Sequence, residues 1–253
     1  MNLSGEEGCR FDHGRVGARP PPRQGTRYRR LDPSRQALLA LAHLRNGDTP
    51  ARLASGFAIG ATTAWRYIKE AVDLLAAQAP NIEPAMHRIA NLAYAILDGT
   101  LIRIDRLTGP QDRRHYAGNT AATEFNAQVI ADPAGRLAWI SPALPGSTHD
   151  LTAARTHRII DALTNAEVMT FADKGYRGAR GSVRTPFYGR NLPEHMREVN
   201  RSHARIRAIG ERAIATLKCW KLLAKLHCCP RRATALLAAI FVLQLIEEQR
   251  HSG

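Results

Sequence analysis

The chain has 253 residues, which is enough for one domain with a sizeable hydrophobic core and a smaller second unit. Its formal net charge of +14 indicates a polyanionic partner, and nucleic acid is favoured over a membrane because the longest apolar run, residues 234–246, is shorter than the roughly 20 residues that span a bilayer. The four cysteines include no C-x-x-C pair and follow no secretory segment, so the sequence predicts neither a zinc site nor a disulfide framework and indicates a reduced, cytoplasmic protein.

Residues 1–30 are rich in glycine, arginine and proline and show no apolar periodicity, which predicts a disordered basic arm. This arm is either an unstructured leader or a tail that contacts DNA. In the whole chain only five of the 36 basic residues are lysines, so arginine predominates. Arginine binds phosphate through two hydrogen bonds at once, which favours nucleic acid, although the codon bias of a GC-rich genome gives the same composition.

Residues 31–80 follow a helical period and are predicted to form a helix-turn-helix DNA-binding domain. Ser34 is the expected N-cap of the first helix. Four residues after it fall near helical spacing: Leu38, Leu41, His43 and Leu44. Leu53 and Ala54 close a second, short helix, and Ala58 stands in the following turn, where glycine is often preferred. The alternative is a three-helix module that serves packing only.

The last helix of this domain is predicted to have two distinct faces. Its buried face consists of Ala64, Tyr67 and Ile68, and Phe57 and Ile59 fill the turn before it. Its exposed face is expected to reach base edges or phosphates through four residues: Thr62, Thr63, Arg66 and Lys69.

After Pro80 the apolar period changes from about 3.6 to about 2, and residues 90–250 are predicted to form an α/β domain. Residues 94–104 and 124–144 are expected to form three strands, the last two joined by a turn at Asp132–Gly135. The expected order is completed by a helix over 149–163, a short buried strand over 166–173, a long helix over 199–223 and an apolar helix at the end of the chain.

Two of the predicted strands end in an acid, Asp98 and Asp173. If these strands lie side by side, the two carboxylates meet at one edge of the sheet, where their repulsion is costly unless a divalent cation lies between them. In the long helix Arg207, Glu211 and Lys218 are separated by four and seven residues, which places them on one helical face. Such a stripe is ordinarily a solvated face with a few ion pairs.

Four short motifs follow one another along the chain. They are LDGT at the first acid, PGSTHD before the predicted helix over 149–163, FADKGYRG at the second acid, and Arg207-x3-Glu211-x6-Lys218. In this order, over residues 31–248, they resemble the motifs of DDE-type DNA transposases, specifically bacterial insertion-sequence transposases and their Harbinger-related eukaryotic relatives. Ala204 stands where many of these relatives carry a tyrosine, which leaves the acid in place but removes a ring that would position a flipped DNA base.

The resemblance implies a ribonuclease H-like mixed sheet flanked by helices, preceded by the helix-turn-helix domain. It implies that Asp98, Asp173 and Glu211 are catalytic and hold two Mg²⁺ (or Mn²⁺) ions for DNA strand cleavage and strand transfer, without a covalent enzyme intermediate. The implied partners are double-stranded DNA, at the terminal repeats of the element and at the target site, and further copies of the chain in a homodimer or larger assembly on DNA. The implied location is the nucleoid of a bacterial cytoplasm.

Basic residues near the acids are expected to hold the DNA phosphates. They are Lys174, Arg177, Arg180, Arg207 and Lys218. Gly175 and Gly178 are expected to let the backbone approach the substrate.

His149 and Asp150 of PGSTHD have two interpretations. Thr148 and Asp150 suit the start of a helix, which favours a capping role, whereas His149 and Asp150 could also assist at the metal site. Two other functions remain open for the whole chain. One is a decayed or domesticated transposase that binds DNA without catalysis, and the other is a ribonuclease H-like nuclease of host function.

Overall fold

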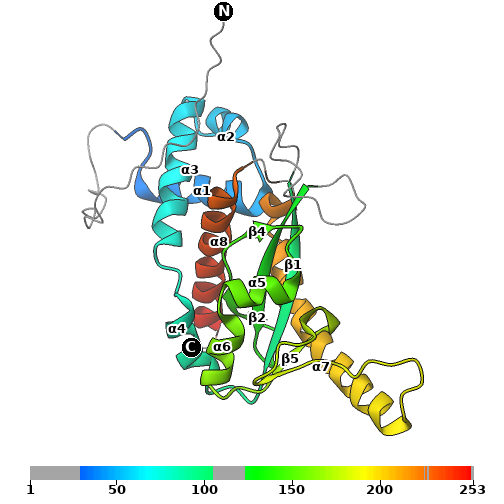
Figure 1. Ribbon diagram of the computed structural model, residues 1–253. Coiled ribbons are helices and arrows are strands. Elements are labelled where there is room, and N and C mark those ends of the chain that lie inside the picture. Colours follow the sequence, from blue (N-terminus) through cyan, green and yellow to red (C-terminus); the bar gives the residue numbers. More distant parts are fainter. Residues whose placement is uncertain (1–28, 105–122, 225, 227, 252–253) are drawn as a thin grey trace, which may run out of the picture.

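The computed structural model describes residues 29–104, 123–224, 226 and 228–251 (Figure 1). Its N-terminal unit is helical and contains α1 (Pro33–Asn46), α2 (Pro50–Gly56) and α3 (Ala61–Ala76). The next helix, α4 (Ile82–Ile89), packs on the second domain. The predicted basic arm, residues 1–30, lies outside the described residues except for its last two positions. Among the helices of the described ranges, none is both long enough and apolar enough to cross a membrane.

Helix α1 differs from the prediction at its start and on its apolar face. Its N-cap is Asp32 rather than Ser34, and the Asp32 carboxylate accepts a hydrogen bond from the Arg35 amide at 3.0 Å. Leu38 and Leu41 are 58% and 40% exposed. The buried residues of α1 are Leu39, Ala40 and Leu44. Consecutive leucines and alanines offer more than one apolar face, and contact with α3 decides which one is buried.

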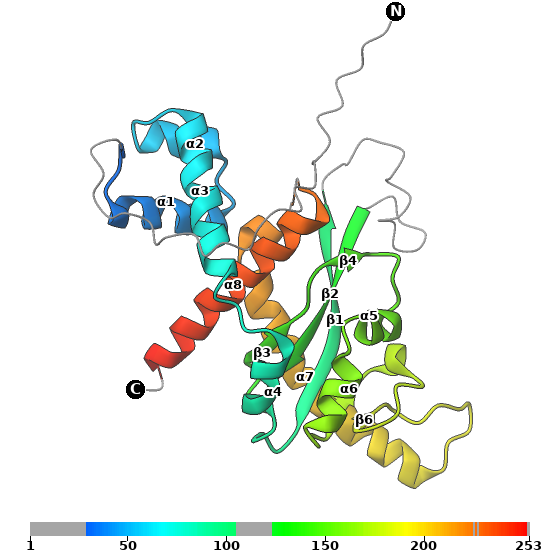
Figure 2. The ribbon, with the colours of Figure 1, turned by 60° about the vertical axis from the view of Figure 1, so that its left-hand side comes forward.

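Helices α2 and α3 pack through the residues that the sequence predicts. Leu53 and Ala54 of α2 are buried, and so is the predicted face of α3, which consists of Ala64, Tyr67 and Ile68. Ala58 in the turn between the helices has a φ of 54°, the left-handed conformation that glycine adopts without strain. Helix α3 also contacts α8 (Pro230–His251), so the N-terminal unit is docked on the second domain through the last helix of the chain (Figure 2).

The second domain is built on one mixed sheet with the strand order β3-β2-β1-β5-β6, to which β4 is added beside β2. β1 (Ala95–Ile104) pairs antiparallel with β2 (Thr123–Ala131), and β2 pairs antiparallel with β3 (Leu137–Ile140) and β4 (Leu144–Pro145). On its other side β1 pairs parallel with β5 (Thr170–Ala172), and β5 pairs with β6 (Val183–Arg184). The predicted hairpin turn is confirmed by a hydrogen bond of 3.0 Å from the Gly135 amide to the Asp132 carbonyl.

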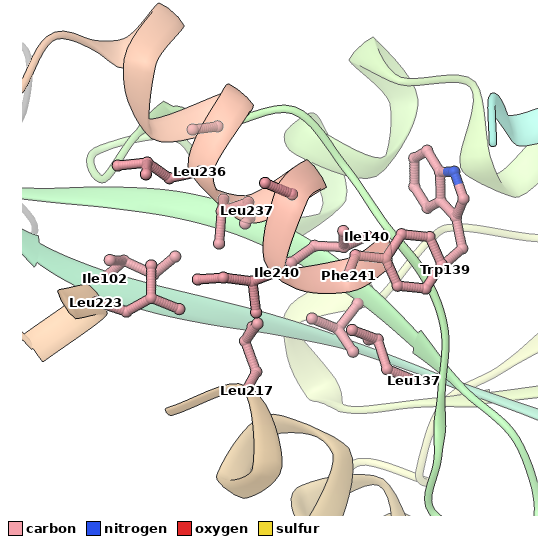
Figure 3. Packing of buried hydrophobic residues seen from close by; sticks show 14 of the residues in the cluster. Ile102, Leu137, Trp139, Ile140, Leu217, Leu223, Leu236, Leu237, Ile240 and Phe241 are labelled. Carbon is pink, nitrogen blue, oxygen red and sulfur yellow. The ribbon is translucent and has the colours of Figure 1, made fainter. Parts of the chain in front are cut away.

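Helices cover both faces of this sheet, which confirms the predicted ribonuclease H-like α/β class. α7 (Glu194–Lys218) lies on the face that carries Ile96, since a Cβ on Gly210 of α7 would come within 2.6 Å of the Ile96 side chain. The opposite face carries Gly99, which approaches Asp150 at the start of α5 (Asp150–Thr156), and α6 (Ile159–Asn165) follows α5. Figure 3 shows buried side chains of α8 facing those of β1, β3 and α7.

Some predicted elements have different bounds in the structure. The predicted helix over 149–163 is two helices, because Arg158 adopts a left-handed φ of 54° between α5 and α6. The long helix begins and ends earlier than predicted, at Glu194 and Lys218, and the short 3-10 helix η3 (Lys221–Ala224) comes after it. Strand β5 is limited to three residues, because the chain turns into the 3-10 helix η2 (Lys174–Tyr176) directly after Asp173.

Candidate active site

The pairing between β1 and β5 stops at the two predicted acids. The parallel register ends with Leu97 opposite Ala172, so the next residues along the two strands are Asp98 and Asp173. Beyond this point β1 continues in its pairing with β2, while the chain after Asp173 turns away into η2. Asp98 therefore lies in the middle of β1, and the prediction that its strand ends there is wrong. The sheet opens beside Asp98.

Asp173 is held at this opening by a hydrogen bond to its own turn. Its Oδ1 accepts from the Gly175 amide at 2.7 Å and caps η2. A Cβ on Gly175 would lie 2.9 Å from Asp173 Oδ1 and 3.2 Å from Asp150 Oδ2, so glycine leaves room for two carboxylates. Glycine is thus required at position 175 to make room for these carboxylates, in addition to the predicted approach of the backbone to the substrate. Gly178 has a φ of 89°, which favours glycine for conformational reasons.

The environment of Asp98 disfavours the ionised form of its carboxyl group. Burial, together with the negative charges of Asp173 and Asp150, raises the pKa of the Asp98 carboxyl from 3.8 to about 6 against the opposing effect of Arg207. Arg207 Nη2 lies 3.9 Å from Asp98 Oδ2, and the Gly99 amide donates to Asp98 Oδ1 at 2.9 Å. A divalent cation would relieve this destabilisation, because it favours the ionised form of nearby carboxyl groups.

The carboxylate of Asp150 reaches the same region from the opposite face of the sheet. Asp150 does not cap a helix, because the N-cap of α5 is His149, and in the described structure this cap makes no side-chain hydrogen bond. Asp150 Oδ1 instead accepts hydrogen bonds from Asn126 Nδ2 at 2.8 Å and from Gln128 Nε2 at 3.2 Å. A Cβ on Gly99 would lie 2.1 Å from the same oxygen. Asp150 therefore occupies a space that only glycine leaves open.

The residues that support Asp150 were not singled out in the sequence. Asn126 and Gln128 lie on one face of β2, and Gln128 is opposite Gly99 in the register of β1 and β2. Tyr176 of η2 is fully buried, and its hydroxyl donates to Gln128 Oε1. Burial raises the pKa of Tyr176 well above its usual value, and the nearby carboxylates act in the same direction, so the hydroxyl remains a donor. The polar alternation of FNAQV within an apolar strand is the signal that could have found this network.

Glu211 lies on α7, on the side of the sheet to which Asp98 points, and it is exposed. Its neighbour Gly210 packs against β1, and Arg207, one turn earlier in α7, reaches Asp98. Within the described residues, no three acidic, histidine or cysteine side chains are already arranged to hold a metal ion. The oxygen donors at the opening are nevertheless of the kind that Mg²⁺ and Mn²⁺ prefer, so the donor chemistry fits such ions.

The predicted phosphate-binding residues differ in their distance from this opening. Exposed on the segment after Asp173 are Lys174, Arg177 and Arg180. The guanidinium of Arg177 stacks over the ring of Tyr188, 4.7 Å from its centroid. Arg207 contacts Asp98 directly, whereas Lys218 is the last residue of α7, about 16 Å further along the helix by its rise per residue.

Comparison with known proteins relates these features to a family. The sequence profile described as DDE superfamily endonuclease matches residues 97–244, more than half of the chain. The chain belongs to the DDE endonuclease superfamily. A second profile, helix-turn-helix of DDE superfamily endonuclease, matches residues 29–81. A relative from Streptomyces albus G, named "Putative transposase for insertion sequence element IS112", is 30% identical over 191 residues, which cover 74% of this chain and 70% of the relative. The resemblance to DDE transposases is thereby confirmed, while the Harbinger-related subtype stays a prediction.

In this DDE endonuclease the helix-turn-helix unit presents α3 as the candidate DNA-binding surface. Three of the predicted contact residues are exposed: Thr62, Arg66 and Lys69. Thr63 is half-buried, and Lys69 forms an ion pair with Asp73 at 2.6 Å. Trp65, which was not singled out in the sequence, is 53% exposed next to Arg66. The exposed face of α3 therefore combines polar, cationic and aromatic groups.

Proposed function

We propose that this endonuclease is a transposase that binds the terminal repeats of its mobile element and catalyses Mg²⁺-dependent DNA strand cleavage and strand transfer. The observation that carries the proposal is that Asp98 and Asp173 come directly after Leu97 and Ala172, the last residues that pair between β1 and β5. The family and the transposase relative support it. We further propose that residues 31–80 bind DNA, that residues 90–250 perform the chemistry, and that the protein acts as a homodimer or larger assembly on double-stranded DNA in a bacterial nucleoid.

In this proposal Asp98, Asp173 and Glu211 hold two Mg²⁺ or Mn²⁺ ions through carboxylate oxygens. When bound, such ions stabilise the attacking and leaving oxygens of an in-line displacement at a phosphodiester. The contribution of the chain is to position its groups: pairing of β1 with β5 fixes the first two acids side by side, and the close packing of Gly210 keeps the helix of Glu211 against β1. Basic side chains around the opening neutralise DNA phosphates.

The experiment that tests this function separates DNA binding from cleavage. Full-length protein is incubated with a duplex that carries the terminal repeat of its element, with and without Mg²⁺. Glu211→Gln keeps the size of the side chain and removes its charge. Cleavage is expected to fall by at least the roughly 10- to 100-fold seen when a partner of a metal ligand is lost, while the affinity for the duplex is unchanged.

A matched control makes the same chemical change elsewhere on α7. Glu198 is exposed and lies more than three turns before Glu211, so Glu198→Gln is expected to cut like the wild type. Cleavage by Glu211→Gln at the wild-type rate would contradict the assignment of the third acid.

The competing function is DNA binding without catalysis. It is favoured by the exposed position of Glu211 and by the finding that the described residues contain no ready three-ligand arrangement for a metal ion. Wild-type protein that binds the element end but does not cut it in Mg²⁺ or Mn²⁺ would establish this alternative.

A further inference from the structure

Carboxylates reach the opening between β1 and β5 from both faces of the sheet. Asp98 points to the face covered by α7, where it meets Arg207. Asp150 comes from the first turn of α5 on the opposite face, directly over Gly99. The pairing of β5 with β1 ends just before this point, and Asp173 is the first residue after the last pair. The three carboxylates therefore approach one opening from different directions.

The two oxygens of Asp150 have different surroundings. Oδ1 accepts hydrogen bonds from Asn126 and Gln128, which fix the orientation of the carboxylate. Oδ2 lies 3.2 Å from the position that a Cβ on Gly175 would occupy, and Asp173 Oδ1 lies 2.9 Å from the same position. Oδ1 is thus the anchor, and Oδ2 borders the same Gly175 position as Asp173 Oδ1.

The position of Asp150 depends on neighbouring residues that an acid at the start of a helix does not need. Glycine must be kept at two positions, Gly99 and Gly175, and a buried polar network must be maintained around Gln128. An acid in a first helical turn interacts favourably with the helix dipole without any of these features, as Asp161 does at the start of α6. The additional features therefore indicate a role for the carboxylate beyond the helix itself.

We propose that Asp150 is a ligand of the divalent cation bound by Asp98 and Asp173, and that Asn126 and Gln128 position it. The inference rests on the proposed function, since it concerns the same metal site. The ligand class is a hard cation such as Mg²⁺ or Mn²⁺, which takes carboxylate oxygens. The competing explanation is structural, with Asp150 serving only as the acceptor for the two amide side chains of β2.

Binding of Mn²⁺ to the full-length protein without DNA tests the proposal independently of catalysis. The loss of the electron paramagnetic resonance signal of free Mn²⁺ gives the Kd. Asp150→Asn is informative because its amide oxygen still accepts from Asn126 and Gln128 while the charge is lost. The Kd for Mn²⁺ is expected to rise about tenfold or more. Asp161→Asn, the matched first-turn acid of α6, is expected to leave the Kd unchanged.

Gly99→Ala disturbs the same site without removing a charge. Its Cβ would lie 2.1 Å from Asp150 Oδ1, so the carboxylate must move and the Mn²⁺ affinity is expected to fall as it does in Asp150→Asn. Circular dichroism and melting temperatures in the absence of metal identify the variants that are folded. Asp150→Asn is expected to melt no lower than the wild type, because it reduces repulsion between carboxylates.

The outcomes distinguish this proposal from the proposed function. If Asp150→Asn binds Mn²⁺ as tightly as the wild type while Asp98→Asn does not, Asp150 is structural and only the present proposal is overturned. If the wild type and Asp98→Asn bind Mn²⁺ equally weakly, the metal site itself is wrong and both proposals fail.

Discussion

Gly210 sets how closely α7 approaches β1. A Cβ at this position would lie 2.6 Å from Ile96 Cγ2 and 3.3 Å from Ile96 Cβ. Ile96 is 1% exposed and β-branched, so this methyl group cannot swing aside. Overpacking of this kind costs about 1–3 kcal/mol, and alanine recovers up to about 1 kcal/mol in helix propensity. Gly210→Ala is therefore expected to lower the free energy of unfolding by about 1–2 kcal/mol.

Gly56→Ala is the matched control for this substitution. Gly56 is also helical, in α2, and a Cβ there would meet nothing within 4 Å in the described structure. Alanine at this position should raise the free energy of unfolding by about 0.5–1 kcal/mol. Urea denaturation followed by circular dichroism, without divalent cations, measures both values, and opposite signs are the expected result.

Ile96→Ala tests whether the effect of Gly210→Ala comes from the contact with the Ile96 side chain. Alone it leaves a cavity and costs about 2–5 kcal/mol. In that background Gly210→Ala no longer meets the Ile96 methyl group, so its effect should become neutral or stabilising. If Gly210→Ala stabilised the otherwise wild-type protein as much as Gly56→Ala does, α7 would have room above β1 and the reasoning would be refuted.

The remaining predictions concern charge. Without divalent cations, Asp98→Asn is expected to raise stability at pH 7 by up to about 3 kcal/mol, because the pKa of about 6 means that ionising Asp98 opposes folding. As the pH rises from about 4 to about 6, the free energy of unfolding of the wild type should fall relative to that of Asp98→Asn. Parallel profiles of stability against pH for the two proteins would contradict the raised pKa. The affinity for duplex DNA should fall steeply as the salt concentration rises. If Arg66 contacts a phosphate, Arg66→Ala should reduce the slope of log affinity against log salt concentration by about 1. If Arg66 reads a base, the same substitution should cost about 1–3 kcal/mol of binding free energy at one base position. Unchanged affinity and unchanged slope would remove Arg66 from the interface.

The approach of Asp98 to Asp173 could be predicted because each acid follows a short apolar run that is typical of a buried strand. The strand bounds could not be predicted equally well. β1 continues for six residues beyond Asp98, and β5 is only three residues long, so the opening is made by unequal strand lengths. Those lengths depend on pairing with β2 and on the turn into η2, which are properties of the assembled sheet.

The placement of Asp150 over Gly99 could not be derived from the sequence, because the partners of Asp150 are distant along the chain. Asn126 and Gln128 are 24 and 22 residues away, and Gly99 lies on another strand. The motif PGSTHD also has a sufficient local explanation, since it suits the start of a helix. Arg158 is a similar case: the apolar period continues through it, so its left-handed conformation follows from the packing of α5 and α6 on the sheet.

Glycines determine how closely other groups approach the predicted catalytic acids and the strand beside α7. Each predicted catalytic acid has a glycine within two positions: Gly99, Gly175 and Gly210. In the first two cases the missing Cβ leaves room for Asp150, and in the third it lets α7 lie against Ile96. Without metal the ionised form of Asp98 is disfavoured, because its pKa is raised. A cation that binds only the folded state would return this free energy by mass action. The raised pKa of Asp98 and the room that two glycines leave for Asp150 therefore both support the proposed cation site.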